Sequence, residues 1–136
     1  MLVVVSALQI VLALVMLLSG LAKSRMSKAR LLQTGQSGMT DLELPTIRFI
    51  GISELLGALG LTLPWWTGIA PWLTPLAALG FAVIMVLAFG VHTGLMRRAP
   101  SPEVARREAW NRVTNVVLLI ASLTVVVVRG GELLGQ

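Results

Sequence analysis

Four long apolar runs restrict what this chain can fold into more than any other feature. They cover residues 2–22, 47–63, 72–95 and 113–128. A helix needs about 20 mostly apolar residues to cross the core of a bilayer, so a chain of 136 residues has little room for anything besides four such helices. Charged residues are only 12% of the chain, about half the share in a typical soluble protein. The sequence therefore predicts an all-α membrane protein in which residues 1–136 form a single domain, a four-transmembrane-helix bundle.

The ends of the predicted helices follow from local signals. Pro64 lacks the N–H that a helix needs, so we expect the second helix to stop there, and we expect the fourth to stop at Arg129, before two glycines. Ser101, Pro102 and Glu103 give a hydroxyl cap, a proline and an acid in the order that begins a helix. The fourth helix is therefore predicted to start near residue 102, before the chain enters the membrane.

The connections between the runs differ in charge. Ten of the eleven lysines and arginines lie in or at the edge of the first and third connections, whereas residues 64–71 carry no charge. By the positive-inside rule the basic connections are cytoplasmic, so both termini are expected outside, in a multi-pass protein of the cell membrane. Topology then explains the net charge of +5, and no nucleic-acid partner is expected. Within the first connection we expect a short surface helix over residues 25–32 and a flexible break at residues 35–38.

Every predicted span contributes polar side chains at one depth, in the cytoplasmic half of the bilayer. They are Ser19 and Lys23 in the first span, Arg48 and Glu54 in the second, His92 in the third, and Asn111 and Asn115 at the start of the fourth. Ionisable groups inside a membrane are costly and therefore point to function. Helical spacing places each set on one inward face, beside small residues that allow close helix contact. The sequence thus predicts a polar pocket toward the cytoplasm, in which Glu54 faces a basic or amide partner from another helix.

The same residues also admit a structural interpretation. An ion pair of Glu54 would lock helices together, and Lys23 and Arg48 would anchor span ends at the bilayer surface. His92 and the two asparagines would then be packed, hydrogen-bonded residues between helices. The glycines of Gly90–Gly94 are spaced as GxxxG, which packs helices within one chain or between two copies, so a homo-oligomer stays open.

Four stretches carry a pattern known from one family. They are Ser19-Gly20-Leu21-Ala22-Lys23; the run from Arg48 through Gly51, Glu54 and Gly57 to Leu61; Ala77 to Phe81 with Met85, Ala88 and His92 behind it; and Asn111 with Asn115. In these stretches, which leave out little besides residues 24–46, the chain resembles the DoxX-like family of small four-helix membrane proteins. The arginine–glycine–glutamate–glycine pattern of the second span is the most specific part.

The resemblance implies a four-helix bundle and, for the name-giving members, a small subunit of a thiosulfate:quinone oxidoreductase. Other members look like accessory proteins of redox or oxidative-stress systems. The partner would then be a redox enzyme subunit or another membrane protein, besides the lipid bilayer, and the cofactor would be a quinone. Glu54 and His92 would hydrogen-bond the quinone oxygens and exchange protons with them, because both can titrate within the membrane.

The residue types exclude several kinds of intrinsic site. With no cysteine and one histidine, the chain has no ligands for a disulfide relay, a thiolate zinc site, an iron–sulfur cluster or a bis-histidine haem. No intrinsic cofactor and no metal site are expected. A nucleophile with its base cannot be assembled either, so the chain is not expected to be an enzyme on its own.

The sequence therefore favours an accessory or subunit-type protein of a membrane redox system that holds a quinone or lipid in the cytoplasmic-side pocket. A purely structural or assembly partner of another membrane protein explains the same residues. A proton-coupled small multidrug-type transporter also has four helices and one buried glutamate, but its essential glutamate lies in the first span and its loops are short. Here Glu54 lies in the second span and residues 24–46 form a long first loop.

Overall fold

The computed structural model describes residues 2–135, and these form helices joined by short connections. The elements in chain order are α1 (Leu2–Arg25), α2 (Lys28–Gln33), the short 3-10 helix η1 (Ser37–Met39), α3 (Leu44–Thr67), α4 (Leu73–Arg97) and α5 (Pro102–Leu134). The helices α1, α3, α4 and α5 are each long and apolar enough to cross a membrane. The predicted all-α architecture with four spans is therefore confirmed.

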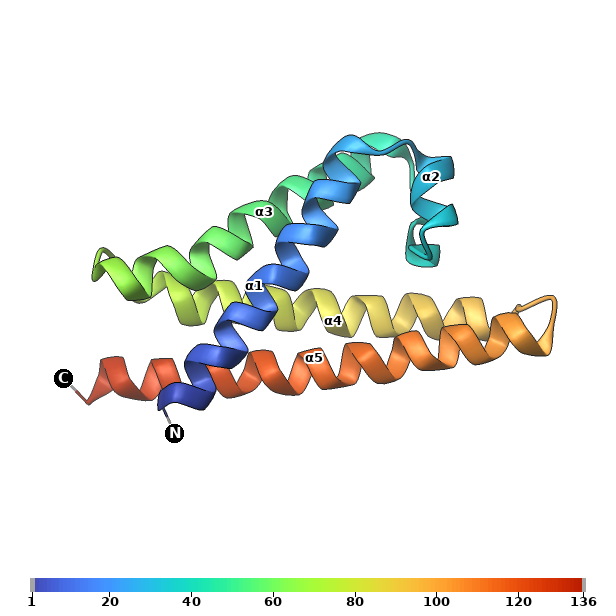
Figure 1. The fold of residues 1–136 in the computed structure, drawn as a ribbon. Coiled ribbons are helices and arrows are strands. Elements are labelled where there is room, and N and C mark those ends of the chain that lie inside the picture. Colours follow the sequence, from blue (N-terminus) through green and yellow to red (C-terminus); the bar gives the residue numbers. More distant parts are fainter. Residues whose placement is uncertain (1, 136) are drawn as a thin grey trace.

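The four long helices form two pairs, α1 with α3 and α4 with α5. The pairs meet near the connection between α3 and α4, here the closed end, and diverge toward the opposite, open end, where α2 and η1 lie (Figure 1). The beginning of α1 and the end of α5 lie at the closed end, and the connection between α4 and α5 lies at the open end (Figure 1). The cytoplasmic location of the open end stays a prediction from the charge pattern.

The core lies where the pairs meet, and the outer faces are apolar too. Leu12, Leu61 and Phe81 are at most 2% exposed and pack in one apolar cluster. Phe49 on α3 and Val127 on α5 are instead 72% and 71% exposed. Because lipid tails are as apolar as leucine side chains, such outward residues suit a membrane, and helix contact depends on close packing rather than on water exclusion.

Two glycines set the contact between α1 and α3. A Cβ atom added to Gly51 would lie 2.8 Å from both the Cβ of Lys23 and the backbone nitrogen of Ser24, and one added to Gly20 would lie 2.7 Å from the carbonyl oxygen of Gly51. The two backbones therefore touch, as small residues allow in membrane helices. This contact brings the end of α1 against the start of α3.

The predicted stop of the second helix at Pro64 is wrong, because α3 continues through that residue to Thr67. A proline within a helix leaves the carbonyl four residues earlier, here that of Gly60, without its N–H donor. The hydroxyl of Thr74 on α4 donates to this carbonyl at 3.1 Å. A neighbouring helix thus supplies the hydrogen bond, as happens at prolines in membrane helices.

The predicted start of the fourth helix is confirmed and its predicted end is wrong. Helix α5 begins at Pro102, and the Ser101 side chain accepts a hydrogen bond from the backbone of Val104. It continues past Arg129 to Leu134. The Arg129 side chain turns into the bundle, where it is 2% exposed, and bonds Glu132 three residues on. The short helix expected over residues 25–32 is observed as α2 (Lys28–Gln33). The flexible break expected over residues 35–38 overlaps the 3-10 helix η1 (Ser37–Met39).

Candidate functional site

A polar cavity of about 510 Å³ lies at the open end between the two helix pairs. It is lined by side chains of all four long helices and by residues of the first connection. Of the residues predicted from sequence, it brings together Ser19, Lys23, Glu54, His92, Asn111 and Asn115. Arg48 lies outside the lining, and its guanidinium donates instead to the carbonyl oxygen of Lys23 at 2.8 Å. It thereby satisfies one of the carbonyls that a helix end leaves free.

On the wall formed by α1 and α3, Glu54 is held in an ion pair. The Lys23 ammonium donates to Glu54 Oε1 at 2.7 Å and to the Ser19 hydroxyl at 2.7 Å. The two charged residues are 7% and 3% exposed. Glu54 therefore faces the bundle interior beside a basic partner from another helix, as the sequence predicted. Its second oxygen, Oε2, is buried without a hydrogen-bond partner among residues 2–135.

On the wall formed by α4 and α5, His92 is paired with a carboxylate that sequence reasoning missed. His92 Nδ1 lies 2.6 Å from Oε2 of Glu108, which is 1% exposed. The amide nitrogen of Asn111 donates to the same oxygen at 3.4 Å and to the Ser37 hydroxyl at 3.5 Å. Glu108 precedes Asn111 by three residues and Asn115 by seven, so extending the inward face of this helix by one turn would have found it.

Asn115 differs from its neighbours because its amide nitrogen is left without a partner. The residue is 8% exposed, and within the described part of the chain Nδ2 makes no hydrogen bond. The structure therefore gives Nδ2 no part in an interhelical hydrogen bond. Nearby, Arg112 packs its guanidinium over the Phe89 ring at 4.5 Å from the ring centre, on the outer side of this wall.

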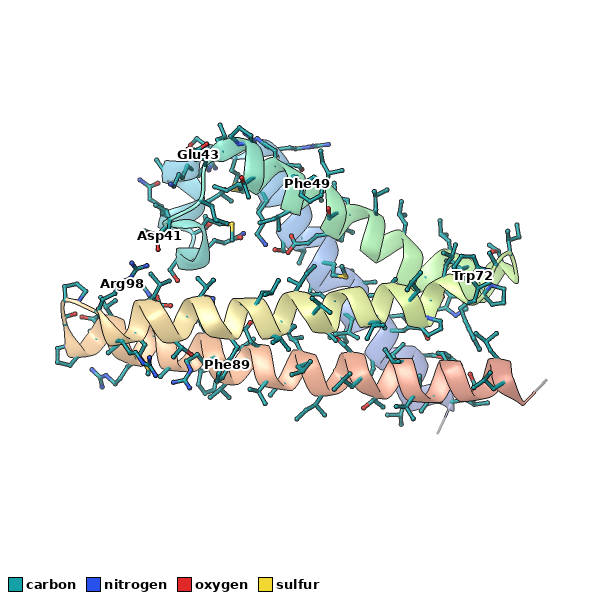
Figure 2. The ribbon with its side chains drawn as sticks, turned by 180° about the vertical axis from the view of Figure 1, so that it is seen from behind. Asp41, Glu43, Phe49, Trp72, Phe89 and Arg98 are labelled. Carbon is teal, nitrogen blue, oxygen red and sulfur yellow. The ribbon has the colours of Figure 1, made fainter. Side chains whose placement is uncertain are left out.

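The cover segment, residues 26–43, lies over the cavity at the open end and is tied to the α4–α5 pair. Asp41 of this segment forms an ion pair with Arg98, which follows α4 (Figure 2). A Cβ atom added to Gly38 would lie 3.5 Å from Nε2 of His92, so the segment passes directly beside that ring. The Ser37 hydroxyl bonds Asn111 across the same gap.

A second polar cluster, at the closed end, was not foreseen as a cluster. The Arg129 guanidinium donates to Gln9 Oε1 at 2.8 Å, to the Ser6 hydroxyl at 2.8 Å and to Glu132 Oε2 at 2.9 Å. It also lies over the Trp65 ring at 4.2 Å. Gln9 in turn donates to the backbone oxygen of Leu61 at 2.6 Å. Arg129 follows Asn115 and Ser122 at seven-residue steps, which is the sequence signal that it faces inward.

Two further sequence features can be placed. Gly90 and Gly94 face open space, since a Cβ atom at either would meet nothing within 4 Å in the described chain. Within residues 2–135, the GxxxG spacing therefore makes no contact with another helix. Among residues 2–135, no group of three or more His, Asp or Glu side chains is placed to hold a metal ion.

Chemically, the polar cavity combines largely apolar walls with polar side chains from all four long helices. Two buried atoms of its lining residues, Glu54 Oε2 and Asn115 Nδ2, make no hydrogen bond within residues 2–135, whereas Lys23 Nζ and His92 Nδ1 have partners. A sequence model described as the DoxX-like family matches residues 7–125, which contain every residue of this cavity. No curated protein and no solved structure matches the chain.

Proposed function

Because this chain belongs to the DoxX-like family, we propose that it is an accessory or subunit-type protein of a membrane redox system. In this proposal it holds a lipophilic ligand, a quinone or a membrane lipid, with the polar head of the ligand in the polar cavity. The basic open end faces the cytoplasm, and the protein lies in the cell membrane. Redox chemistry is supplied by a bound quinone or by a partner enzyme.

The observation that carries the proposal is a largely apolar cavity in which polar side chains of all four long helices meet, with the Lys23–Glu54 ion pair on one wall and His92 on the other. Its volume, about 510 Å³, lies in the usual range for ligand sites, about 300–1,000 Å³. Buried polar atoms in proteins are nearly always hydrogen-bonded. Within the part of the chain described here, Glu54 Oε2 and Asn115 Nδ2 are not, and a shift of either side chain that opens its atom to the cavity would let a polar ligand head bind it.

The residues of this chain would bind and orient such a ligand. Lys23 fixes the Glu54 carboxylate in position, and Phe81, Ile84 and Met85 offer an apolar surface for the ligand. The His92 ring lines the same cavity and is held in place by Glu108, with 2.6 Å between His92 Nδ1 and Glu108 Oε2.

Mass spectrometry of small molecules that co-purify with the protein in mild detergent tests the proposal. We expect a defined quinone or lipid with the wild type, and about tenfold less of it with Glu54→Gln, because hydrogen bonds to charged groups contribute about 1.5–3 kcal/mol. Glu103→Gln is the matched control, since this glutamate is exposed and lies outside the cavity lining. If no molecule is specific to the wild type, and Glu54→Gln only lowers thermal stability, the cavity residues form a structural lock.

A further inference from the structure

We propose that the polar head of the ligand binds Nε2 of His92, in the space beside Gly38, and that Glu108 is the positioning residue that leaves this nitrogen free for it. This inference rests on the proposed function and specifies which atom of the cavity wall binds the head.

The two nitrogens of the His92 ring differ in their surroundings. Nδ1 lies 2.6 Å from Glu108 Oε2, whereas Nε2 makes no hydrogen bond within residues 2–135. Nε2 is not buried either, because the buried unbonded side-chain atoms in this part of the chain belong to other residues. The side chain of His92 is 14% exposed and lines the cavity. Nε2 is therefore a polar atom of the cavity wall that a ligand can reach.

The space beside Nε2 is kept open by a glycine of the cover segment. A Cβ atom added to Gly38 would lie 3.5 Å from Nε2 and 3.6 Å from Cε1 of His92, which are ordinary van der Waals distances. Gly38 lines the cavity too, and the glycines of the described chain with a positive φ are Gly35 and Gly68. Gly38→Ala would thus add a methyl group without strain and fill the space. In the native chain the same space admits a hydroxyl or carbonyl oxygen next to Nε2.

Glu108 determines which ring nitrogen is offered to the ligand. Its carboxylate is buried, and both oxygens face donors: Asn111 Nδ2 lies 3.4 Å from Oε2, and Arg107 Nε lies 3.8 Å from Oε1. These donors favour the ionised carboxylate, which only accepts hydrogen bonds. Nδ1 of His92 then donates to Oε2, and this hydrogen bond fixes the role of the other nitrogen. Nε2 accepts a hydrogen bond when the ring is neutral and donates one when the ring is charged.

The first test follows the ring itself. Because His92 is the only histidine of the chain, ¹⁵N-labelled histidine reports on this ring alone in NMR spectra of the full chain in mild detergent. We expect a proton on Nδ1 in the wild type. In Glu108→Gln we expect part of the population to lose it, because an amide can donate to Nδ1 as well as accept from it. The matched control Glu103→Gln, at an exposed position, should keep the wild-type spectrum.

Two results of this test would overturn the role of Glu108. One is an Nδ1 without a proton in the wild type, and the other is a ring unchanged by Glu108→Gln. A general loss of packing would not by itself move the proton from one ring nitrogen to the other, so the spectrum distinguishes a positioning role from a structural one.

The second test follows the ligand, with decyl-benzoquinone, its hydroquinone and dodecanol as probes. We expect at least one probe to bind the wild type and to shift the Nε2 signal more than the Nδ1 signal. Gly38→Ala should weaken this binding about tenfold, because the added methyl group keeps the head from its hydrogen bond, and should leave thermal stability unchanged. Gly90→Ala is the matched control, since a Cβ atom there meets nothing within 4 Å in the described chain.

The outcomes separate the inference from the proposed function. If the wild type binds none of the probes, the proposed function fails, and the contact with Nε2 fails with it. If a probe binds but neither shifts the Nε2 signal nor binds Gly38→Ala more weakly, the inference alone is overturned. Binding of the benzoquinone supports an Nε2 that donates to a carbonyl. Binding of the hydroquinone supports an Nε2 that accepts from an aromatic hydroxyl, and comparable binding of dodecanol supports a lipid alcohol as the source.

Discussion

Each end of the bundle buries a basic side chain, but the polar groups around that side chain are hydrogen-bonded to different extents. At the closed end, Arg129 bonds Gln9, Ser6 and Glu132 and also covers Trp65. At the open end, Lys23 bonds only one oxygen of Glu54, and three buried polar atoms in the described chain stay without partners, on Glu54, Arg112 and Asn115.

This difference separates a lock from a candidate binding site. A fully satisfied buried network stiffens a structure, whereas an unsatisfied group in low dielectric costs free energy until something binds it. The number of polar residues is therefore a poor guide to function in this bundle. The number of polar atoms that remain unbound is the better guide, and substitutions at Arg129 and Asn115 test it directly.

The largest effect is expected at the closed end. Arg129→Met would leave Gln9 Oε1 and Glu132 without the donor that now binds them. We expect the free energy of unfolding in detergent to fall by about 3 kcal/mol, as for other broken buried ion pairs, with the head group of a bound ligand unaffected. Arg106→Met, at an exposed position, is the control. A loss no larger than in this control would show that the closed end is not a lock.

A substitution at the contact between α1 and α3 should lower the free energy of unfolding nearly as much. A methyl group on Gly51 would force the backbones of α1 and α3 apart, so Gly51→Ala should lower the free energy of unfolding by about 2 kcal/mol. Gly80→Ala is the matched control, because a Cβ atom there meets nothing within 4 Å in the described chain. Equal stability of the two variants, measured by thermal unfolding, would contradict the close contact.

At the open end we expect a substitution to raise the free energy of unfolding instead of lowering it. Asn115→Leu replaces a buried amide whose nitrogen is unbonded in the described chain with an apolar side chain, so the ligand-free protein should become more stable by about 1 kcal/mol. The same variant should retain less of the co-purifying ligand. A loss of stability similar to that of Arg129→Met would mean that both ends are locks and would remove the contrast between them.

The smallest effect is expected for the ion pair that joins the cover segment to the α4–α5 pair. Asp41 and Arg98 are both 59% exposed at their side chains, and exposed ion pairs contribute little and are screened by salt. Asp41→Asn should change the free energy of unfolding by less than about 0.5 kcal/mol, and high salt should abolish the difference. An effect as large as that of Gly51→Ala would show that the cover segment is part of the folded core.

The spans, the start of α5 and the inward face of Glu54 could be predicted from sequence because each depends on local signals: apolar length, a Ser-Pro cap and helical spacing. The continuation of α3 through Pro64 could not, because it depends on a hydroxyl from another helix, that of Thr74. The pairing of the site residues could not be predicted either, because it also depends on side chains from other helices. Glu108 was missed because charged residues near span ends usually face water. Arg129 lies on the inward face that helical spacing predicts, but its partners come from other parts of the chain and could not be foreseen.

The hydrogen bond from Thr74 to the carbonyl of Gly60 also has a mechanical consequence. It fastens α3 to α4 near the closed end, whereas α3 begins at Leu44, about 24 Å farther along its axis at 1.5 Å per residue. Beyond this point α3 stays packed on α1 through Gly51, so the two helices together form the arm of a lever about the fastened point. A rotation of about 5° around it displaces the tip of the arm by about 2 Å. A rotation of this size would widen the mouth of the cavity by about the size of a methyl group.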